Sequence, residues 1–513
     1  MNLCLRLRLA IGGARGCGWW WPAAAGLFLL TLFPLAVGAA VDTGATAQPT
    51  APVPPAVPVL MVSDVHFDPF MGMDSNAVAE LAQAQPADWD KIFAKHFVEQ
   101  NWSGRFDTSY LLWQTSLKTM KTNAAGVRFV TLSGDLLAHD FDTQFFTACS
   151  SGNCGDLASF AEKTIDYVLR ELRTTLGVPV YAALGNNDSP CHDYDLTPGS
   201  DFLHTVGETI TKDVPAKERD QAEIDFSGEG YYSVTLPAPL NNTRLLVVDD
   251  IFLASSYGPC PSGPQPPAGK PVPLVGGPWI PWLEKQLGAV RADKKDDAKA
   301  WVMGHIPSGV DPFNTVKKKL NVCGKTGKPP KMFLPTPDPG SPDELEAALS
   351  PFGDVITLAI FAHSHMDELR LLPGAQAGDP AVAMKMVPSI SPFNSNYPSI
   401  TIAIVDPATA TLVDYQVIAA PDQTGVNPNW TQEYDFAKDY VMPAGKPALS
   451  AAALGQLIDR FRAGTDPADA LYWKYYETGV QGYLDAGNWH EYVCLMDHFT
   501  PSDFTKCTCG TTH

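Results

Sequence analysis

Five short polar blocks, each at the end of a predicted buried strand, constrain this sequence more than any other feature. The blocks are Asp64-Val65-His66, Gly134-Asp135, Gly185-Asn186-Asn187-Asp188, Gly304-His305 and His363-Ser364-His365. Asp, Asn and His side chains are suitable ligands for divalent transition metals. Residues two apart in an extended chain share a face, so the members of each Asp-x-His or His-x-His pair point the same way. The series therefore predicts one polar site built from strand ends that lie far apart in the sequence.

The apolar pattern alternates short β-rich runs with helical stretches, which predicts an α/β fold. Nine runs are predicted strands: Val57–Val62, Val127–Leu132, Val178–Leu184, Arg244–Val248, Ala300–Met303, Val355–Phe361, Ala381–Val387, Ser399–Val405 and Leu412–Ile418. Helical segments separate the first three runs, as in a parallel sheet, whereas the last three lie close together and predict an antiparallel meander. Two facing sheets flanked by helices would satisfy both halves of the pattern.

Two Pro- and Gly-rich stretches, Tyr257–Pro278 and Pro307–Pro342, are longer than ordinary connections between elements. We expect them to be rim loops or lids of the site, the alternative being loose surface insertions. The main domain is predicted over residues 57–420. A C-terminal helical, cysteine-containing extension is predicted over residues 421–513, with aromatic residues that pack rather than bind. Its first helix has an apolar stripe formed by Leu454, Leu457, Ile458 and Phe461.

The N-terminus has the pattern of an export signal. Three arginines precede an uncharged, largely apolar stretch from Trp19 to Val37, and small residues follow it. We predict a signal peptide over residues 1–40 and an Ala-, Pro- and Thr-rich disordered linker over residues 41–56. The expected location is secreted or periplasmic. The alternative is an uncleaved N-terminal membrane anchor, because the apolar stretch is nearly long enough to span a bilayer.

Eight of the ten cysteines lie beyond the predicted signal, and an even number in an exported chain predicts disulfides. Cys149 and Cys154 flank a Ser-Ser-Gly-Asn turn and are predicted to pair with each other. The sequence does not assign partners to the other six. The alternative for Cys507-Thr508-Cys509 is a zinc site, which the spacing disfavours.

The net charge of −20 argues against binding along a nucleic-acid backbone, which requires a positive face. The same charge argues against simple electrostatic adhesion to anionic membranes, and contact with a membrane is left open. The charge does not define the polarity of a single cleft, because bound cations would invert the local field.

The five blocks together resemble the signature of the calcineurin-like metallophosphoesterases, which reads Asp-x-His, Gly-Asp, Gly-Asn-His-Asp/Glu, Gly-His and Gly-His-x-His. A finer resemblance, in residues 134–140, 305–309 and 389–399, is to the acid sphingomyelinase-like phosphodiesterase branch, which includes the endopolyphosphatases. This resemblance covers residues 57–420 well and covers the C-terminal helices only loosely. The resemblance implies a four-layer α-β-β-α sandwich with a C-terminal helical appendage.

The resemblance also implies a site for two divalent metal ions, with zinc expected first and iron or manganese as alternatives. One ion would be held by Asp64, His66 and His365. The other would be held by Asn186, His305 and His363. Asp135 would bridge the two ions, and a carboxylate is also on chemical grounds the ligand best able to span two cations. Two such ions lower the pKa of a bound water, which then serves as the nucleophile on a phosphoester.

Two positions depart from the family pattern. Ala362 replaces the usual glycine before the first closing histidine, and we expect this to be tolerated if the local φ is negative. Asn187 replaces a histidine that orients the phosphate or protonates the leaving oxygen, and an amide cannot act as an acid at working pH. The predicted catalytic positions are therefore Asn187 itself and two candidate proton donors, His139 first and His192 second. For either histidine the alternative is a surface residue, or one that only supports the ligands.

Four further polar residues are predicted near the site with weaker support. Asp68 and Asp188 are expected to orient ligands through hydrogen bonds, the alternative being plain turn carboxylates. Asn394 and Tyr397 are expected to reach the cleft through a late loop, the alternative being packing.

The sequence thus predicts an exported, metal-dependent phosphoric-ester hydrolase, a phosphodiesterase or phosphatase that acts by direct attack of a metal-bound water. The runner-up is an endopolyphosphatase or a nucleotide phosphohydrolase. The Gly-Asn-Asn-Asp block favours this alternative, whereas the acidic composition disfavours a long polyanion as the substrate. A distant alternative is a non-catalytic, metal-containing binding module. The expected substrate is a small-molecule or lipid phosphate ester, no nucleic-acid-binding surface is expected, and we expect a monomer.

Overall fold

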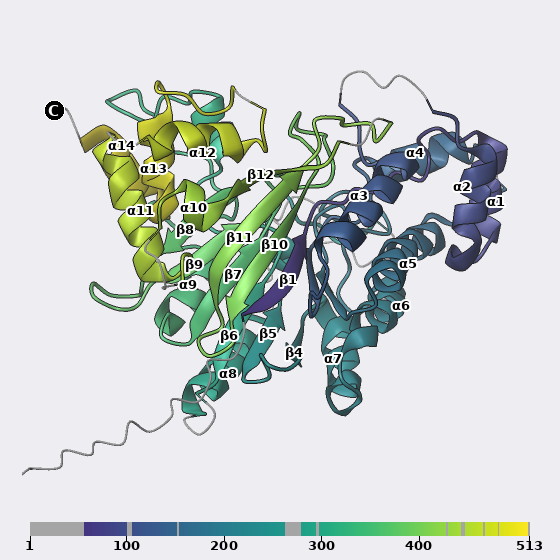
Figure 1. Cartoon of the computed structure of the whole chain (residues 1–513), viewed down its shortest axis with the longest axis horizontal. Helices are drawn as coiled ribbons and strands as arrows, with labels where there is room; N and C mark the ends of the chain where they lie inside the picture. The colour runs from purple at the N-terminus through teal and green to yellow at the C-terminus, as the bar shows by residue number, and fades with distance from the viewer. Residues whose placement is uncertain are drawn as a thin grey trace, which may run out of the picture. The chain divides into compact units, whose positions relative to one another are not determined.

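Two six-stranded mixed sheets form the centre of the protein in the computed structural model (Figure 1). The first sheet has the order β12 (Thr431–Asp435), β11 (Thr411–Ala419), β10 (Ser399–Asp406), β1 (Val57–Val62), β2 (Val130–Ser133) and β3 (Val180–Ala183). The second has the order β4 (Tyr232–Thr235), β5 (Thr243–Val247), β6 (Lys299–Met303), β7 (Ile356–Phe361), β9 (Val382–Met386) and β8 (Glu368–Leu372).

The structure describes residues 56–99, 105–150, 153–261, 279–293, 297–426, 429–442, 447–464, 467–480 and 482–510. The predicted signal peptide and all but the last residue of the predicted linker lie outside these residues. The predicted rim loop from Tyr257 to Pro278 is described only as far as residue 261.

Each sheet joins a parallel half to an antiparallel edge. In the first sheet β1, β2 and β3 are parallel, and β1 pairs on its other side with antiparallel β10. In the second sheet β5, β6, β7 and β9 are parallel, and β4 and β8 close the two edges antiparallel. The central parallel strands are almost continuously apolar because both of their faces are buried.

Fourteen α-helices occur in the described residues. They are α1 (Ser75–Gln83), α2 (Trp89–His96), α3 (Tyr110–Asn123), α4 (Phe141–Ala148), α5 (Leu157–Leu176), α6 (Asp201–Ile210), α7 (Ala216–Glu229), α8 (Trp279–Ala292), α9 (Glu344–Leu349), α10 (Phe436–Asp439), α11 (Ala451–Ala463), α12 (Ala468–Tyr476), α13 (Trp489–Asp497) and α14 (Pro501–Gly510). Helices α5 and α6 pack on β3 of the first sheet, and α8 packs on β5 and β6 of the second. The predicted four-layer arrangement of helices outside two sheets is confirmed.

The longest helix, α5, shows how the sequence sets its own boundaries. Asp156 caps its first turn by accepting a hydrogen bond from the Ser159 amide, and Gly177 ends it in the left-handed region at φ +67°. Its buried residues recur at helical spacing along one stripe, so the helix covers the sheet with one face and meets solvent with the other.

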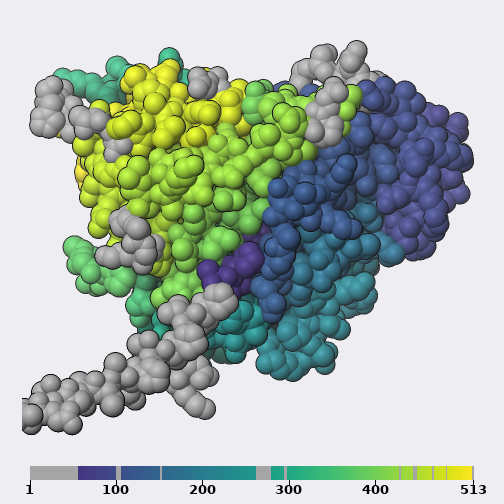
Figure 2. Space-filling model, viewed as in Figure 1, coloured from purple at the N-terminus to yellow at the C-terminus, as the bar shows by residue number. Residues whose placement is uncertain are grey.

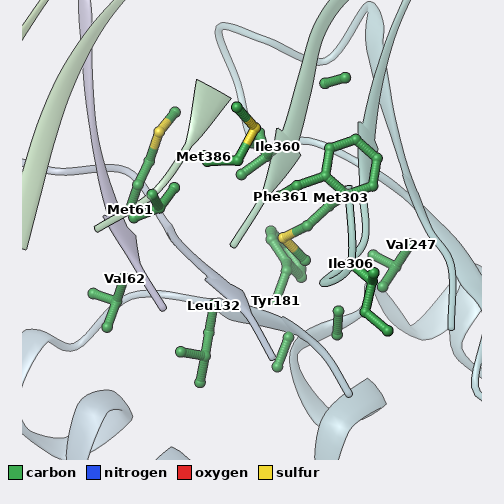
Figure 3. Close-up of a cluster of buried hydrophobic side chains, with 14 of the residues drawn as sticks. Met61, Val62, Leu132, Tyr181, Val247, Met303, Ile306, Ile360, Phe361 and Met386 are labelled. Atoms are coloured by element: carbon green, nitrogen blue, oxygen red, sulfur yellow. The ribbon is translucent and has the colours of Figure 1, made fainter. Parts of the chain in front are cut away.

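The two sheets share one hydrophobic core. Buried side chains from both sheets meet in the cluster of Figure 3, which includes Met61, Leu132, Met303, Ile360 and Met386. Between the sheets, Tyr232 of β4 donates a hydrogen bond to the Ala182 carbonyl of β3 and accepts one from the Ala182 amide. The core therefore fixes the strands of one sheet against those of the other.

All nine predicted strands are present within a few residues of the expected boundaries, but the predicted meander is wrong. Strand β9 lies in the second sheet, parallel to β7, whereas β10 and β11 form an antiparallel pair in the first. The predictions also missed β4, β8 and β12. Strand β8 was not predicted because Glu368 and Arg370 interrupt its apolar pattern. Both residues are fully buried, and a guanidinium nitrogen of Arg370 lies 3.0 Å from Oε2 of Glu368.

The C-terminal helices are present and pack on the second sheet, with α11 and α13 both against β8. Figure 2 shows the yellow C-terminal residues lying directly against the green residues of the late strands. The predicted apolar stripe of α11 is buried. As expected, the aromatic residues of α12 pack inward: Tyr475, for example, stacks on Tyr434 of β12 at 4.4 Å between ring centroids.

Four disulfides join the eight cysteines beyond the predicted signal. The predicted pair Cys149–Cys154 is confirmed. The other bonds are Cys191–Cys260, Cys323–Cys509 and Cys494–Cys507, so the alternative zinc site at Cys507 and Cys509 is wrong. None of the helices in the described ranges is both long and apolar enough to cross a membrane.

Replacing Cys323 and Cys509 together by serine should lower the free energy of unfolding by about 3–5 kcal/mol, because this disulfide closes a long loop. The two cysteines are 186 residues apart, whereas Cys149 and Cys154 are 5 apart. The same double change at Cys149 and Cys154 should therefore lower the free energy of unfolding by a smaller amount. Urea denaturation followed by circular dichroism measures both losses, and a larger loss for the short loop would contradict the expectation.

Candidate metal centre

The five polar blocks meet at the carboxyl ends of central strands from both sheets. Blocks from the first sheet follow β1, β2 and β3, and those from the second follow β6 and β7. One ligand atom from each of Asp64, His66 and Asp135 lies within 4.8 Å of the others, and the same holds for Asp135, His305 and His363. The structure therefore brings together residues that are about three hundred positions apart in the sequence.

Asp135 lies between the two halves of this cluster. Its Oδ2 atom is 3.3 Å from Nε2 of His66 and 3.1 Å from Nε2 of His305. On the first side, Nε2 of His365 lies 3.7 Å from Oδ1 of Asp64. On the second side, the Nδ1 atom of His363 lies 3.3 Å from Nε2 of His305. These groupings have the arrangement that the resemblance implies, with one carboxylate common to both sides, while the assignment of each ligand to an ion stays a prediction.

Backbone carbonyls fix the imidazole tautomers at two positions. Nδ1 of His66 is 2.9 Å from the Leu137 carbonyl, and Nδ1 of His305 is 2.8 Å from the Ser133 carbonyl. A carbonyl oxygen only accepts hydrogen bonds, so each Nδ1 carries a proton and each Nε2 is the ring nitrogen turned to the cluster.

Both Nε2 atoms lie against acceptor atoms of neighbouring ligands. Nε2 of His305 lies 3.1 Å from Oδ1 of Asn186, whose amide nitrogen is already used in a hydrogen bond to Asp193. Nε2 of His66 lies 3.2 Å from Nε2 of His365. Acceptors facing acceptors repel one another unless a proton or a cation lies between them.

Two further atoms point to a missing partner. Oδ2 of Asp64 and Nδ1 of His365 are buried and have no hydrogen-bond partner among the described residues. Buried polar groups in folded proteins are nearly always satisfied, so such a pair in one cluster requires an explanation. Together with the converging ligand atoms of Asp135, His66, His305 and His363, these atoms show that the residues present fit divalent metal ions.

Burial and the mutual charges perturb the pKa values in the cluster. Burial raises the pKa of Asp64 to about 7, with the His305 charge opposing and the Asp135 charge adding to the effect. Burial also lowers the pKa of His363 to about 3 and holds those of His66 and His365 well below their usual range. These three imidazoles are therefore neutral, which is the form that binds a metal.

Asp135 and His305 behave in the opposite way because they pair with each other. Burial alone would raise the pKa of Asp135, but the charge of His305, the His305 hydrogen bond and the hydrogen bond from the Asn187 amide hold it well below its usual range. Burial alone would lower the pKa of His305, but the charge of Asp135 and its hydrogen bond raise it to about 10. The centre of the cluster is thus an ionised carboxylate that attracts positive charge.

The backbone around the cluster is strained. Five of the predicted ligands, Asp64, His66, Asp135, His363 and His365, have positive φ values between 43° and 70°. Side chains other than glycine rarely adopt this region, and strain of this kind gathers at functional sites. Ala362 is not among the positive-φ residues, so the expected condition for replacing the family glycine at this position is met.

Asn187 and Asp188 hold Asp135 and its loop in place. The backbone amide and side-chain amide of Asn187 donate to the two carboxylate oxygens of Asp135 at 2.8 and 2.9 Å. The Asp188 carboxylate accepts from the amides of Gly185, Leu136 and Leu137. Asp188 thus orients the ligand loops as expected. Asp68 instead accepts from the Phe70 and Met71 amides, as a turn carboxylate does.

Sequence reasoning missed residues that support the ligands. Asp250 accepts a hydrogen bond from the His305 amide at 2.7 Å, and the hydroxyl of Tyr194 lies 3.4 Å from Nε2 of His363. Asp250 follows β5 in Val248-Asp249-Asp250, so it carries the same strand-end signal as the five blocks. Tyr194 lies in a loop with no comparable signal.

The first proton-donor candidate lies against the cluster. The His139 ring stacks on His66 at 3.9 Å between centroids, and Phe393 stacks on its other face at 3.8 Å. Asp107 is buried and accepts from both the amide and Nδ1 of His139. One ring nitrogen of His139 lies within 4.8 Å of ligand atoms of His66 and His365, so His139 stands at the edge of the cluster.

The second candidate lies apart from the cluster. The His192 side chain is 57% exposed and pairs with Asp142 at 3.2 Å. No contact of His192 with a predicted metal ligand is found among the described residues. The arrangement favours His139 over His192, while the catalytic role of either stays a prediction.

A cavity of about 380 Å³ opens beside the cluster at His363 and Ser364. Part of its wall comes from the predicted rim loop over Pro307–Pro342, including the π-helical turn Phe313–Lys317. Asn394 also lines the cavity, as expected. Tyr397 does not line it and packs instead beside Gly479.

No family model matches the chain. The chain is similar to acid sphingomyelinase-like phosphodiesterase 3b of Homo sapiens, with 24% identity over 462 residues that cover 87% of this chain and 89% of that protein. It is also similar to sphingomyelinase phosphodiesterase D of Dictyostelium discoideum, with 23% identity over 363 residues that cover 66% of this chain and 70% of that protein. These relatives confirm the resemblance to the acid sphingomyelinase-like phosphodiesterases.

Among solved structures, a purple acid phosphatase from yellow lupin (Lupinus luteus) seeds aligns with 74% of this chain and 53% of its own. The identity over this alignment is 9% and the TM-score is 0.34.

Replacing Gly185 by alanine should displace Asp135, because the added methyl group would lie 2.2 Å from Oδ1 of Asp135 and 2.4 Å from its amide nitrogen. We expect a loss of roughly 1–3 kcal/mol in the free energy of unfolding and a lower content of bound metal. Thermal unfolding and elemental analysis measure the two effects. Gly288 of α8 has no atom within 4 Å of an added methyl group, so Gly288→Ala is the matched control. Equal behaviour of the two variants would contradict the expectation.

Proposed function

We propose that this protein is an exported, metal-dependent hydrolase of phosphoric esters. The single observation that carries the proposal is the convergence of acceptor atoms on Asp135 from the strand ends of both sheets. The similarity to proteins named phosphodiesterases supports the same reaction class. Four disulfides support an exported protein, since such bonds persist in oxidising compartments.

Two divalent ions are the proposed cofactors, with zinc first and iron or manganese as alternatives. One ion would be held by Asp64, His66 and His365, the other by Asn186, His305 and His363, with Asp135 common to both. When bound, such a pair lowers the pKa of water and neutralises charge on a phosphoester.

The chain's own residues prepare the site for this chemistry. Asn187 holds both oxygens of Asp135 so that the carboxylate keeps one orientation. The carbonyls behind His66 and His305 hold the protons on Nδ1, so both rings keep their Nε2 atoms turned to the site. Asn187 itself supplies no proton, which leaves the leaving-group oxygen to another residue.

We assign the role of proton donor to His139. Its ring is held between His66 and Phe393, and Asp107 fixes Nδ1, so a proton on Nε2 is held beside the cluster. The Asp107 hydrogen bond and charge outweigh burial and raise the pKa of His139, which favours the protonated form needed by an acid. Asp107 is in this proposal a positioning residue.

The distant alternative is a binding module that keeps the metal site without turnover. Its only support in the sequence is Asn187, and the arrangement of His139 on Asp107 offers a replacement for the missing histidine. We therefore favour the enzyme.

Changing Asp135 to asparagine should lower hydrolysis of bis-p-nitrophenyl phosphate by more than about a hundredfold, beyond the loss expected for a residue that only supports a ligand. The variant should keep its circular dichroism spectrum. Asp74→Asn is the control, because Asp74 caps α1 far from the cluster and asparagine caps equally well. A folded, metal-replete wild-type protein that cleaves no phosphomonoester, diester or anhydride would establish the binding module instead.

Changing His139 to glutamine should lower hydrolysis in proportion to the need for an acid. For an alkyl phosphodiester, whose leaving group is poor, we expect a loss of about 10²–10⁴-fold, with a much smaller loss for a p-nitrophenyl ester. Steady-state kcat for the two substrates measures the difference. His192→Gln tests the second candidate, and His204→Gln is the control, because His204 bonds to Ser227 on the surface. A larger loss in His192→Gln, or equal losses for both substrates in His139→Gln, would contradict the assignment.

A further inference from the structure

A fully buried arginine, Arg370 of β8, contacts two groups that adjoin predicted metal ligands. Its Nη2 atom lies 3.0 Å from Oε2 of Glu368, which is also fully buried. Its Nη1 atom donates to the Ser308 carbonyl at 2.9 Å, and the guanidinium lies over the Phe333 ring at 5.1 Å from the centroid. A buried ion pair adds little net stability compared with apolar side chains of similar size, so stability alone does not account for it.

The first contact holds the loop that follows His305. Ser308 is three residues beyond His305, and its hydroxyl also donates to Oδ1 of Asp343 at 3.0 Å. The His305 carbonyl in turn accepts a hydrogen bond at 2.9 Å from the amide of Ala362, the residue before His363. A displacement of the Ser308 turn would therefore reach the backbone of both predicted ligands.

The second contact holds the ring that packs on His363. The ring centroids of Phe333 and His363 are 5.6 Å apart, and the two planes meet edge to face at 72°. Nδ1 of His363 lies 3.3 Å from Nε2 of His305, so a rotation of the His363 ring would separate two predicted ligands of one ion. The Phe333 amide donates to the Gly309 carbonyl at 3.0 Å, so both contacts of the guanidinium fall on one connected loop.

The C-terminal extension fixes the other end of the ion pair. The hydroxyl of Tyr476, the last residue of α12, donates to Oε1 of Glu368 at 3.2 Å, and its carbonyl accepts from the Asp367 amide at 2.9 Å. The hydroxyl of Tyr472 in the same helix accepts from the Leu369 amide at 3.1 Å. Three successive residues beyond the last metal-ligand block are thus bound to one helix of the extension.

We propose that Arg370 is a positioning residue for the ion assigned to Asn186, His305 and His363, and that the C-terminal extension holds Arg370 through Glu368. The proposal rests on the proposed metal-dependent function and deepens it, because it gives the extension a part in metal binding without contact with an ion. A guanidinium is suited to this role. Its planar fork donates to a carboxylate and to a carbonyl in two fixed directions at once, which an ammonium group does not do.

The double variant Glu368→Gln with Arg370→Met tests the proposal in the full-length protein. It removes both charges together, so no buried charge is left unpaired and the fold should be retained. The contacts with the Ser308 loop are lost, so one of the two dissociation constants for zinc should rise about 10–100-fold, as for other residues that support a ligand. Titration of the metal-free protein with zinc, in competition with a chromogenic chelator, measures both constants. His363→Ala identifies which constant belongs to the affected ion.

Leu369→Ala is the matched control for a loss of stability alone. Leu369 is buried in the same strand, and its side chain points to the face opposite that of Arg370. This variant should lower the Tm of the metal-free protein and leave both zinc constants unchanged.

Two milder variants separate positioning from charge balance. Arg370→Lys keeps a positive charge beside Glu368 but loses the fork, so it should still weaken the same ion. Tyr476→Phe removes only the hydroxyl from the extension and should raise the same constant by a smaller factor, about threefold.

Wild-type zinc affinity in both the double variant and Arg370→Lys would overturn the proposal. So would zinc constants that follow the Tm across all variants, Leu369→Ala included, because the role of Arg370 would then be structural only. An unchanged constant in Tyr476→Phe would overturn the part assigned to the extension. A wild type that binds no zinc, iron or manganese would instead overturn the proposed function itself.

Discussion

The buried carboxylate of Asp135 is the interaction on which the rest of this structure depends. It lies between an imidazole from the end of β1 and another from the end of β6, so it joins the two sheets at one point. A buried charge is costly unless it is paired and hydrogen-bonded. The protein meets this requirement with two imidazoles and two donors from Asn187. The close approach of Gly185 and the three amides held by Asp188 follow from placing this carboxylate there.

The cluster is costly for the folded chain. Several ligands have left-handed backbone conformations, and the Nε2 atoms of His66 and His365 face each other at 3.2 Å. Strain of this kind persists only where the surrounding structure over-determines it. The surroundings here are a core shared by both sheets, together with four disulfides. Metal binding would relieve the electrostatic part of the cost, so that affinity for the ions and stability of the fold would be linked.

The ligand cluster and the cavity beside it are built from different parts of the chain. The cluster is built on strand ends, which are held rigidly by the sheets. The cavity wall is built on loops and on the C-terminal segment, which supplies Glu477 and Tyr483. The disulfide between Cys323 and Cys509 ties the loop over residues 307–342 to the last helix. Loops on a rigid scaffold can change their specificity without disturbing the strand ends.

The sequence alone determined nine of the twelve strands and the ligand blocks because both are local signals. An apolar run followed by Asp, Asn or His can be recognised without knowing what it contacts, and the five blocks were found in this way. Strand β8 (Glu368–Leu372) was not predicted because it contains two charged residues. Glu368 and Arg370 can be buried in this strand only because they form an ion pair with each other. A pattern of single residues cannot contain that pairing.

Only the tertiary structure decided which elements meet. The sheet that β9 joins, the partners of six cysteines, the support of His139 by Asp107 and the residues around the cavity all depend on contacts between distant residues. Spacing along the chain does not specify such contacts, because they arise from how the two sheets pack and where their loops then lie. The sequence therefore determined which residues could bind metal, and the packing of the sheets decided what surrounds them.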